Sequence, residues 1–573
     1  MKAFSCHPVV ACMTALILLP LSSIAITNTV TTLTDEDNGN LNPANGSGTS
    51  LREAINHSAP DDTIVFDIGG TNDTIVLTNT LTISKNLTID GTLPTNAPVV
   101  VAAQADAYGG GYAHGSSFRK IELDAGQQFR VLNLEAPGPI TVALRNMTLS
   151  KGYDLNYGAG LNVSFQTTAL LKNVTLKYNL TDGYGSVHVD GPLDLEDCRL
   201  KYNEAYGGGG LAVNSAGNVV VRDTRFRSNT AVYGGALINY GQTEIIDTRF
   251  STNTAVNGGA LYSGYGDLTI NRSAFRRNAA FTGGALLAEY SNTVVSNTTF
   301  SSNVASNSFG AVGFSYGDTR IHNSTFSGNI ANSKIINAGF GNFHINHATI
   351  ANNTVSSGPE IEHATGTASI CNSVIDKVGV LAGTYSLGNN HIGSGHGLSL
   401  LVRYNRDHRV HVPLPGSPLI GAAGASSLMT DQLGSLRPMP ATIGAVEDGT
   451  NVTAAIWSKD VDGSGKPFGQ VWSSSPDYPV DTSKLQLTLT SNSFARVRVT
   501  LNPDAVSNVT YRIGRAANLS SATWGEVASY DASMGLQSNL MVYAVSNHFE
   551  LEYIDDIDDE EHFNVSFKLN LGL

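Results

Sequence analysis

The sequence predicts an all-β protein: a parallel β-solenoid, or β-helix, of about 25 residues per coil, followed by a small C-terminal β-sandwich-like domain. The first observation is an apolar-x-x-Asn pattern that recurs about every 25 residues. Its asparagines are Asn179, Asn203, Asn229, Asn253, Asn278, Asn303, Asn329 and Asn353. The second is a Gly-Gly-Ala-Leu pattern, starting at 234, 258 and 283, that keeps the same period. A unit of this length cannot bury its apolar face alone, so successive units must stack.

The residues between these marks predict short strands. Segments such as TEIIDTRF (243–250) alternate polar and β-branched residues and end in phenylalanine. Stacked coils lie about 4.8 Å apart, so like residues form ladders along the axis. We expect an inward phenylalanine ladder of Phe226, Phe250, Phe275, Phe300 and Phe326. We expect a turn ladder, with amides bonded between coils and left-handed backbone angles tolerated, of Asn229, Asn253, Asn278, Asn303 and Asn329.

The two ladders predict different costs of truncation. Phe250→Ala should destabilise the fold by about 3 to 5 kcal/mol, because it empties a packed core position. Asn253→Ala should cost less, about 1 to 3 kcal/mol, because it leaves turn partners unsatisfied. The Gly-Gly pairs are expected to permit a tight corner before the next strand.

The segment 1–25 predicts export. Lys2, an apolar run over 9–21 and the small residues Ser23 and Ala25 are typical of a secretory signal peptide. No other segment approaches the roughly 20 apolar residues of a membrane span. We therefore expect a secreted or cell-surface protein with no transmembrane segment after the signal is removed.

The charge of the chain limits the classes of molecule that it could bind, and the positions of its cysteines limit disulfide formation. Charged residues make up 14% of the chain, the net charge is −14, and no basic stripe stands out, which argues against a nucleic-acid partner. Cys198 and Cys371 lie seven coils apart in the sequence, or about 33 Å along the axis at the strand spacing. A disulfide needs Cα atoms within about 7 Å, so both should be unpaired core residues.

The two ends of the repeat region resemble a known family. TSLREAI (49–55), with helical spacing before a strand, resembles the Cys-Ser-Leu-Arg-Glu-Ala motif of exported bacterial β-helix proteins, with Thr49 in place of the cysteine. Residues 414–447 resemble the closing element called the choice-of-anchor Q region, and the coils are similar to repeats of chlamydial polymorphic outer-membrane proteins. The resemblance implies a secreted or surface-displayed, right-handed parallel β-helix, in a group where some members act in adhesion.

These marks divide the chain into five parts. Residues 449–573 are too few for the outer-membrane barrel that ends the polymorphic proteins, and strand-like runs such as 484–501 favour a small soluble β domain. The parts are a signal peptide (1–25), an N-terminal cap (26–73), the parallel β-helix (74–400), a closing cap (401–448) and the C-terminal β domain (449–573).

Catalysis would require carboxylates brought together over a groove. The strongest candidates are Asp182, Asp190 and Asp194 in the early coils, which would serve a polysaccharide lyase or glycoside hydrolase. The acids do not persist along a turn position that we align as Asp223, Asp247, Asn271, Asn297 and Asn323. Ordinary polar turn residues explain this drift, so the sequence favours a non-catalytic protein.

Two further sets of residues are candidates for binding. Tyrosines follow the Gly-rich stretch in successive coils and could form an aromatic platform for sugar rings, or a ladder that only stiffens the solenoid; they are Tyr240, Tyr265, Tyr290 and Tyr316. Asp460 and Asp462 resemble the start of a Ca²⁺ loop, but the closing acid is replaced by Val471, so we expect no cofactor, with calcium as the alternative.

The sequence supports three functional hypotheses. The first is an exported, non-catalytic β-helix that acts in adhesion or binds extracellular polysaccharide or other cell-surface molecules. The second is a polysaccharide lyase or glycoside hydrolase working on the early coils. The third is a structural spacer for residues 449–573.

Overall fold

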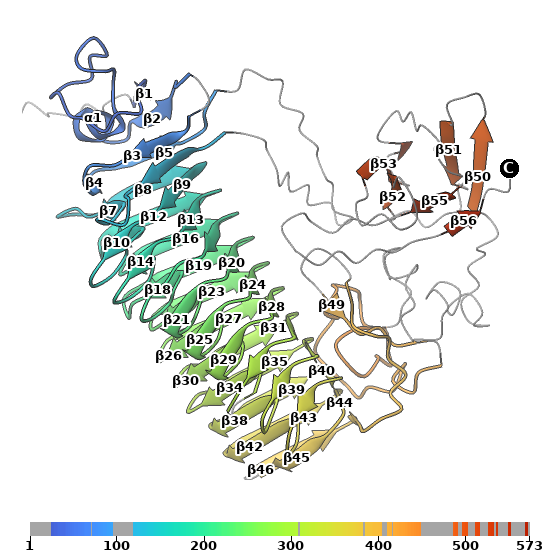
Figure 1. The fold of residues 1–573 in the computed structure, drawn as a ribbon. Helices are drawn as coiled ribbons and strands as arrows, with labels where there is room; N and C mark the ends of the chain where they lie inside the picture. The colour runs from blue at the N-terminus through green and yellow to red at the C-terminus, as the bar shows by residue number, and fades with distance from the viewer. Residues whose placement is uncertain are drawn as a thin grey trace, which may run out of the picture.

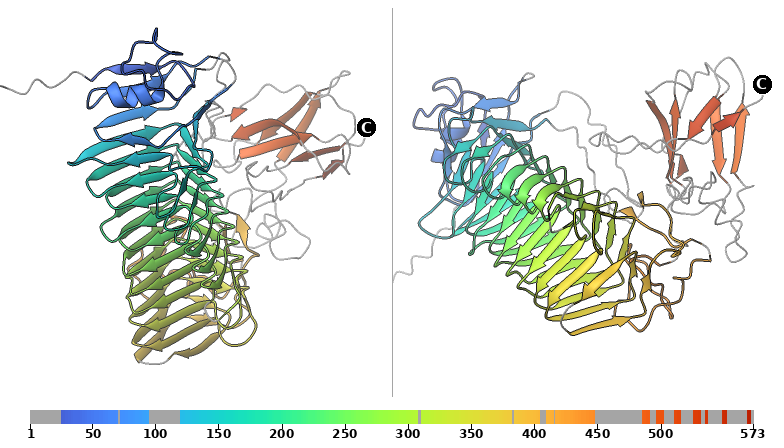
Figure 2. Two further views of the ribbon diagram at one scale, coloured as in Figure 1. Left: turned by 60° about the vertical axis from the view of Figure 1, so that its left-hand side comes forward. Right: turned by 60° about the horizontal axis from the view of Figure 1, so that its bottom comes forward.

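The computed structural model describes residues 25–69, 72–94, 119–307, 310–381, 384–403, 409–414 and 416–447, and strands between 485 and 570. Its coils stack into one elongated solenoid (Figure 1), whose three long parallel sheets are visible from two further directions in Figure 2. We call these sheets A, B and C; each full coil contributes one strand to C, then A, then B. The predicted parallel solenoid is therefore confirmed, with coils of about 25 residues.

Sheets A and B follow each other along every coil. The 14 strands of sheet A are β1 (Thr27–Val30), β2 (Thr63–Phe66), β5 (Leu87–Asp90), β8 (Ile140–Arg145), β12 (Thr167–Lys172), β16 (Pro192–Glu196), β19 (Asn218–Arg222), β23 (Gln242–Ile246), β27 (Asp267–Asn271), β31 (Thr293–Ser296), β35 (Thr319–His322), β39 (Phe343–Asn346), β43 (Thr367–Cys371) and β46 (Thr384–Gly388). The 13 strands of sheet B are β3 (Thr74–Val76), β6 (Ile121–Asp124), β9 (Met147–Ser150), β13 (Thr175–Lys177), β17 (Arg199–Lys201), β20 (Arg225–Arg227), β24 (Arg249–Ser251), β28 (Ala274–Arg276), β32 (Thr299–Ser301), β36 (Thr325–Ser327), β40 (Thr349–Ala351), β44 (Val374–Ile375) and β47 (His391–Ile392).

Sheet C completes the coil, and short strands bridge the corner between B and C. The 12 strands of sheet C are β4 (Leu81–Ile83), β7 (Leu132–Leu134), β11 (Leu161–Val163), β15 (Val187–Val189), β18 (Leu211–Val213), β22 (Leu237–Asn239), β26 (Leu261–Gly264), β30 (Leu286–Glu289), β34 (Val312–Ser315), β38 (Ile336–Phe340), β42 (Ile361–Thr365) and β45 (Val378–Leu381). The bridging strands are β10 (Tyr153–Asp154), β14 (Leu180–Thr181), β21 (Thr230–Tyr233), β25 (Thr254–Asn257), β29 (Ala279–Thr282), β33 (Val304–Ala305), β37 (Ile330–Ala331) and β41 (Thr354–Val355).

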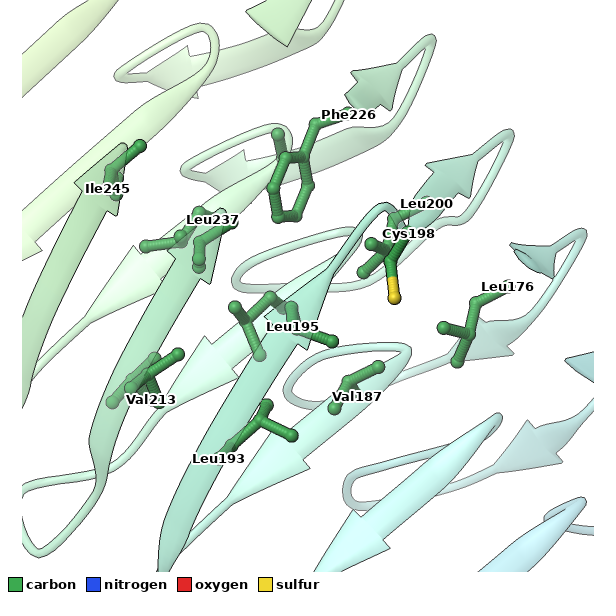
Figure 3. Packing of buried hydrophobic residues seen from close by; sticks show 14 of the residues in the cluster. Leu176, Val187, Leu193, Leu195, Cys198, Leu200, Val213, Phe226, Leu237 and Ile245 are labelled. Atoms are coloured by element: carbon green, nitrogen blue, oxygen red, sulfur yellow. The ribbon is translucent and has the colours of Figure 1, made fainter. Parts of the chain in front are cut away.

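The core lies inside the coils and is built from ladders of like residues. Aliphatic side chains from all three sheets point inward around Leu195 and Phe226 (Figure 3). The predicted phenylalanine ladder is confirmed: Phe250 is fully buried and stacks on Phe226 and Phe275 with ring centroids 4.7 and 4.6 Å apart. The aromatic rings pack closely at the strand spacing, so this ladder is a continuous part of the hydrophobic core.

The asparagine ladder is also confirmed, and it is longer than the five residues expected. Nδ2 of Asn253 donates to the carbonyl oxygen of Phe226 (3.0 Å) and to Oδ1 of Asn278 (3.0 Å), and this pattern runs from Asn179 to Asn353. The left-handed backbone, however, does not belong to the asparagines. It belongs to the residue before each of them, such as Thr252 with φ 54°, because this turn residue reverses the chain while the amide faces inward.

The corner between sheets A and B corrects one alignment. The positive-φ position is occupied by Asp247 (φ 50°) and then by Arg272 (φ 44°), whereas Asn271 pairs with Ile246 inside the strands. The sequence analysis aligned Asn271 with Asp247 because both are polar turn-type residues, but Asn271 lies one residue before the turn position. Arg272 instead forms an ion pair with Asp247 across the coils, at 2.7 Å.

The asparagine ladder ends on a buried carboxyl group. Nδ2 of Asn353 donates to Oε1 of Glu360 (3.0 Å), and the backbone N–H of Lys377 donates to Oε2 (3.2 Å). Burial raises the pKa of Glu360 from 4.5 to about 7. The folded state therefore binds this proton more tightly than the unfolded chain does.

The free energy of unfolding of the wild type should decrease as pH rises, and Glu360→Gln should remove this decrease. Because the folded pKa is raised, the contribution is complete below the unfolded pKa of 4.5 and is lost as pH rises through about 7, a change on the order of 3 kcal/mol. Urea unfolding at about pH 5 and about pH 8 should show a smaller loss in the variant than in the wild type. Glu362→Gln, two residues away in a half-exposed ion pair with Lys334, is the control. Equal pH dependence in wild type and Glu360→Gln would contradict the prediction.

The N-terminal segment folds as the sequence predicted. A helix, α1 (Leu51–His57), begins with a reciprocal capping box between Ser50 and Glu53 and buries Leu51 and Ile55. Arg52 forms a bidentate contact with Asp35, at 2.8 Å for both nitrogens. Seven residues long, α1 is the one helix in the described ranges and cannot cross a membrane.

Residues 409–414 and 416–447, here called the closing segment, lie against the outer face of sheet B. It begins with β49 (Arg409–Val410), which pairs antiparallel with β48 (Val402–Arg403). His411 Nε2 lies 2.8 Å from Ser327 Oγ, and Nε2 of Gln432 donates to Thr299 Oγ1 at 2.8 Å. The segment thus doubles back beside the last coils.

The remaining features concern the cysteines and the C-terminal region. Cys198 and Cys371 are free, as expected, but Cys371 is only half-buried because it lies at the end of β43.

The C-terminal strands pair antiparallel, in contrast to the solenoid. They are β50 (Leu485–Thr490) with β51 (Arg496–Leu501), and a sheet of β54 (Gly535–Leu536), β53 (Gly525–Asp531), β52 (Thr510–Arg515), β55 (His548–Leu551) and β56 (Lys568–Asn570).

Candidate functional site

Three of the four tyrosines proposed as a platform form an exposed ladder at the corner between sheets C and A. Tyr265, Tyr290 and Tyr316 stack with ring centroids 4.8 and 4.6 Å apart, and Phe340 extends the stack at 4.5 Å. The rings are nearly parallel, at 5° to 12°, so neighbouring rings cover each other's faces. Only the end rings of this stack, Tyr265 (74% exposed) and Phe340 (43% exposed), have a face that no ring of the ladder covers. This aromatic ladder therefore suits stiffening of the corner better than sugar binding.

Tyr240 is not part of that ladder. Asn239 pairs with Ser263, and the next position opposite Tyr240 is Gly264, so Tyr265 is an extra residue in its coil. A Cβ atom at Gly264 would lie 2.9 Å from the Tyr240 ring, so the missing side chain makes room for it. Tyr240 packs edge-to-face on Tyr262, at 6.5 Å and 68°.

A second set of tyrosines, here called the tyrosine row, lies on sheet C and its preceding corner. Its members come from successive coils, with Tyr233 and Tyr240 on either side of the same strand, and are Tyr157, Tyr184, Tyr206, Tyr233, Tyr262 and Tyr240. The sequence analysis named only Tyr240 among them. The signal that could have found four others is a Tyr-Gly pair at 157, 184, 206 and 233, just before or within the Gly-rich corner.

The geometry of the tyrosine row differs from that of the ladder. Tyr184 meets Tyr206 at 6.0 Å and 87°, Tyr206 meets Tyr233 at 5.7 Å and 61°, and Tyr233 meets Tyr262 at 5.3 Å and 68°. Edge-to-face contacts cover one ring face with an edge and leave much of the other ring uncovered. Tyr157, Tyr184 and Tyr206 are 38% to 44% exposed. The row therefore presents aromatic faces at intervals of about one coil.

Glycine positions the row. The backbone column beside sheet C runs through Tyr157, Tyr184, Gly207 and Tyr233. A Cβ atom at Gly207 would lie 2.7 Å from the Tyr184 ring. Because Gly207 has no side chain, the Tyr184 ring can lie over it and meet Tyr206 from the side.

The hydroxyl groups of Tyr240 and Tyr262 remain protonated at neutral pH. Burial raises the pKa of Tyr240 to about 12, and neighbouring tyrosines and Glu289 add to the rise. Burial also raises the pKa of Tyr262, whose hydroxyl donates to Glu289 Oε2 at 2.7 Å. Phenolic hydroxyls of this kind can both donate and accept hydrogen bonds.

The early end of the row carries charges that are matched within the chain. Arg130 pairs with Asp154 at 2.9 Å and lies 5.2 Å from the centre of the Tyr157 ring. His188 packs on Tyr157 at 4.5 Å, and its Nδ1 lies 3.1 Å from Asn162 Oδ1. Burial lowers the pKa of His188, which favours a neutral ring. This end therefore offers hydrogen-bonding groups without a net positive charge.

The three candidate catalytic acids do not form one constellation. Asp182 accepts from the Tyr153 hydroxyl at 3.2 Å, and Asp190 accepts from Asn214 Nδ2 at 2.6 Å. Asp194 lies on the outer face of sheet A, 3.8 Å from Arg222. The partners differ for each acid, and only Asp190, which is 3.7 Å from His188 Nδ1, adjoins the tyrosine row. Their catalytic role stays a prediction.

Within the described ranges, no group of three or more His, Cys, Asp or Glu side chains is arranged to hold a metal ion. Asp460 and Asp462 lie outside the described residues, so the calcium alternative stays a prediction.

The likenesses between this chain and solved structures are weak. No protein-family model matches the sequence, and no curated protein matches it. The crystal structure of pectate lyase Pel9A is similar with a TM-score of 0.29 and 15% identity, over 74% of this chain and 97% of that one. The catalytic unit of a thermostable GH87 alpha-1,3-glucanase from Streptomyces thermodiastaticus strain HF3-3 has a TM-score of 0.28 and 14% identity, over 64% and 72%. At these values neither likeness bears on function.

Proposed function

We propose that this protein is a non-catalytic polysaccharide-binding protein and that the tyrosine row is its binding face. The observation that carries the proposal is the edge-to-face arrangement of the row, which leaves ring faces of Tyr184 and Tyr206 partly open on successive coils. Sugar rings place apolar C–H groups on such faces and hydroxyls beside protonated phenols. A straight, repeating row suits an extended polymer better than a small compact ligand.

The charges around the row favour a neutral polysaccharide. Arg130 is engaged by Asp154, while Asp190 and Glu289 add negative charge. An acidic polymer would meet like charge at this face and would be repelled. The setting that we propose is outside the cell, where such polymers occur, and the signal-like residues 1–25 support export.

Truncation of two exposed rings should abolish most of this binding. Affinity electrophoresis of the mature protein against a panel of soluble neutral polysaccharides should show retention that falls about tenfold in Tyr184→Ala/Tyr206→Ala. Tyr290→Ala/Tyr316→Ala removes two rings of the aromatic ladder and should keep the affinity of the wild type. Circular dichroism checks that both variants fold.

The same panel separates the alternatives. Release of reducing or unsaturated ends would make the protein a lyase or hydrolase and overturn the proposal. Equal loss in both double variants would move binding away from the row. No retention of any polysaccharide by the wild type would favour a spacer.

A further inference from the structure

The outer face of sheet B gathers basic residues that are scattered in the sequence. Parallel pairing places Arg199 opposite Arg225 and Arg225 opposite Arg249. A second column beside it runs through Lys177, Lys201 and Arg227. The expectation of no basic stripe is therefore wrong, because the stripe is made from residues about one repeat apart.

We call this surface the cationic face; it comprises Lys177, Arg199, Lys201, Arg225 and Arg227. It lies in a chain whose net charge is −14. The face occupies the coils from β13 to β20, and the closing segment covers sheet B further along, from Thr299 in β32. The cationic face is thus a bounded surface on a different sheet from the tyrosine row.

Like charges at this spacing are unfavourable without anions. Neighbouring strands lie about 4.8 Å apart, and like charges directly opposite each other on a sheet destabilise it. Arg249 and Arg276, in the next two strands of sheet B, are only 8% and 7% exposed and interact within the chain, so they are not counted in the face. Burial and nearby Arg199 lower the pKa of Lys120, beside this face, to about 8. These facts agree that the face is positive and is stabilised by anionic groups.

Acids supply part of that counter-charge. Lys177 pairs with Glu122 at 2.9 Å. Lys201, Arg225, Arg227, Arg249 and Arg276 also interact within the chain. An external anion would therefore exchange with such contacts, as counterions do when a polyanion binds.

We propose that the cationic face binds an anionic polysaccharide whose carboxylate or sulfate groups recur along its length. Two parallel columns of basic side chains, repeated once per coil, match a polymer with regularly spaced charges lying along the solenoid axis. Arginine forks bind carboxylate and sulfate oxygens with paired hydrogen bonds. The proposal is independent of the tyrosine row, which we assign to neutral polymers.

The face fits a nucleic acid less well. Single strands bind where positive charge alternates with open aromatic faces. The aromatic residues beside the columns, Tyr178 and Tyr202, stack on each other at 5.3 Å and 8°, so each covers a face of the other. Duplex DNA carries one charge per about 1.7 Å of its axis, much denser than one coil per about 4.8 Å.

The test uses the full mature chain with two polyanionic probes, oligosaccharides of heparin and of polygalacturonate, and single-stranded DNA of matched charge. Titration calorimetry at about 50 and about 200 mM salt should show binding of at least one oligosaccharide that weakens steeply with salt. In Arg225→Gln/Arg227→Gln, which removes one charge from each column, the affinity should fall about tenfold for each arginine removed. The slope of log affinity against log salt should shrink by about one unit for each.

Matched variants keep this test falsifiable. Lys172→Gln/Arg320→Gln removes two positive charges from sheet A and should leave binding unchanged, as should Tyr184→Ala/Tyr206→Ala. Removal of adjacent like charges should not unfold the sheet, which thermal unfolding would check. The proposal is overturned if neither oligosaccharide binds, if both charge variants weaken binding equally, or if DNA binds more tightly than the oligosaccharides.

Discussion

Asn253→Ala is expected to lower the free energy of unfolding by about 3 to 5 kcal/mol, as much as Phe250→Ala. The amide is fully buried and makes four side-chain hydrogen bonds of 3.0 to 3.1 Å. Its loss leaves the backbone N–H of Asn229, one Nδ2 proton of Asn229 and the carbonyl of Phe226 without these partners. Each such group costs about 1 to 3 kcal/mol when buried. The sequence analysis expected amides bonded between coils, but its smaller cost did not count each buried group that loses a partner.

Urea unfolding of Asn253→Ala, Phe250→Ala and a surface control measures this. Asn342→Ala is the control, because Asn342 is exposed and its Nδ2 makes one bond, to Asp318 at 2.8 Å. The control should change stability by less than about 0.5 kcal/mol. If Asn253→Ala destabilised no more than Asn342→Ala, the ladder would be a by-product of coil stacking and not a source of stability.

The ladders show what a repeat reveals and what it hides. Because Phe250 and Asn253 recur at one phase of the period, the sequence alone placed them in stacked columns facing the core. The sign of φ does not follow from recurrence, so Thr252 and not Asn253 holds the left-handed turn. An insertion of one residue, Tyr265, was likewise hidden, and it moved Tyr240 out of its expected column.

The candidate site was harder to predict for a related reason. The tyrosine row combines different phases of the repeat: Tyr233 precedes a corner glycine, whereas Tyr262 lies in a sheet C strand. Edge-to-face contacts join residues from neighbouring positions, which a search for one repeated column does not detect. The cationic face escaped notice because Arg199 and Arg225, which are opposite each other on sheet B, stand one repeat apart in the sequence.

Arg437→Ala is expected to release the closing segment from the last coils at a cost of about 3 to 5 kcal/mol. The Arg437 side chain is 2% exposed and forms an ion pair with Glu447, which is 5% exposed. Its Nη2 also donates to Oδ1 of Asn323 in the solenoid, at 2.8 Å, and so joins the segment to sheet A's corner. Removal leaves the Glu447 carboxylate buried beside Asp431 without its cation. A buried charge that loses its partner is more costly than the pair itself is stabilising.

The loss should be local, because the phenylalanine and asparagine ladders of the coils do not depend on Arg437. Hydrogen exchange should rise across residues 416–447 in Arg437→Ala and stay unchanged around Phe250. Arg437→Ala/Glu447→Gln removes the stranded charge as well and should recover a large part of the stability. Exchange that rises throughout the solenoid, or a double variant no more stable than Arg437→Ala, would show that burial of the segment and not the charge pair holds it in place.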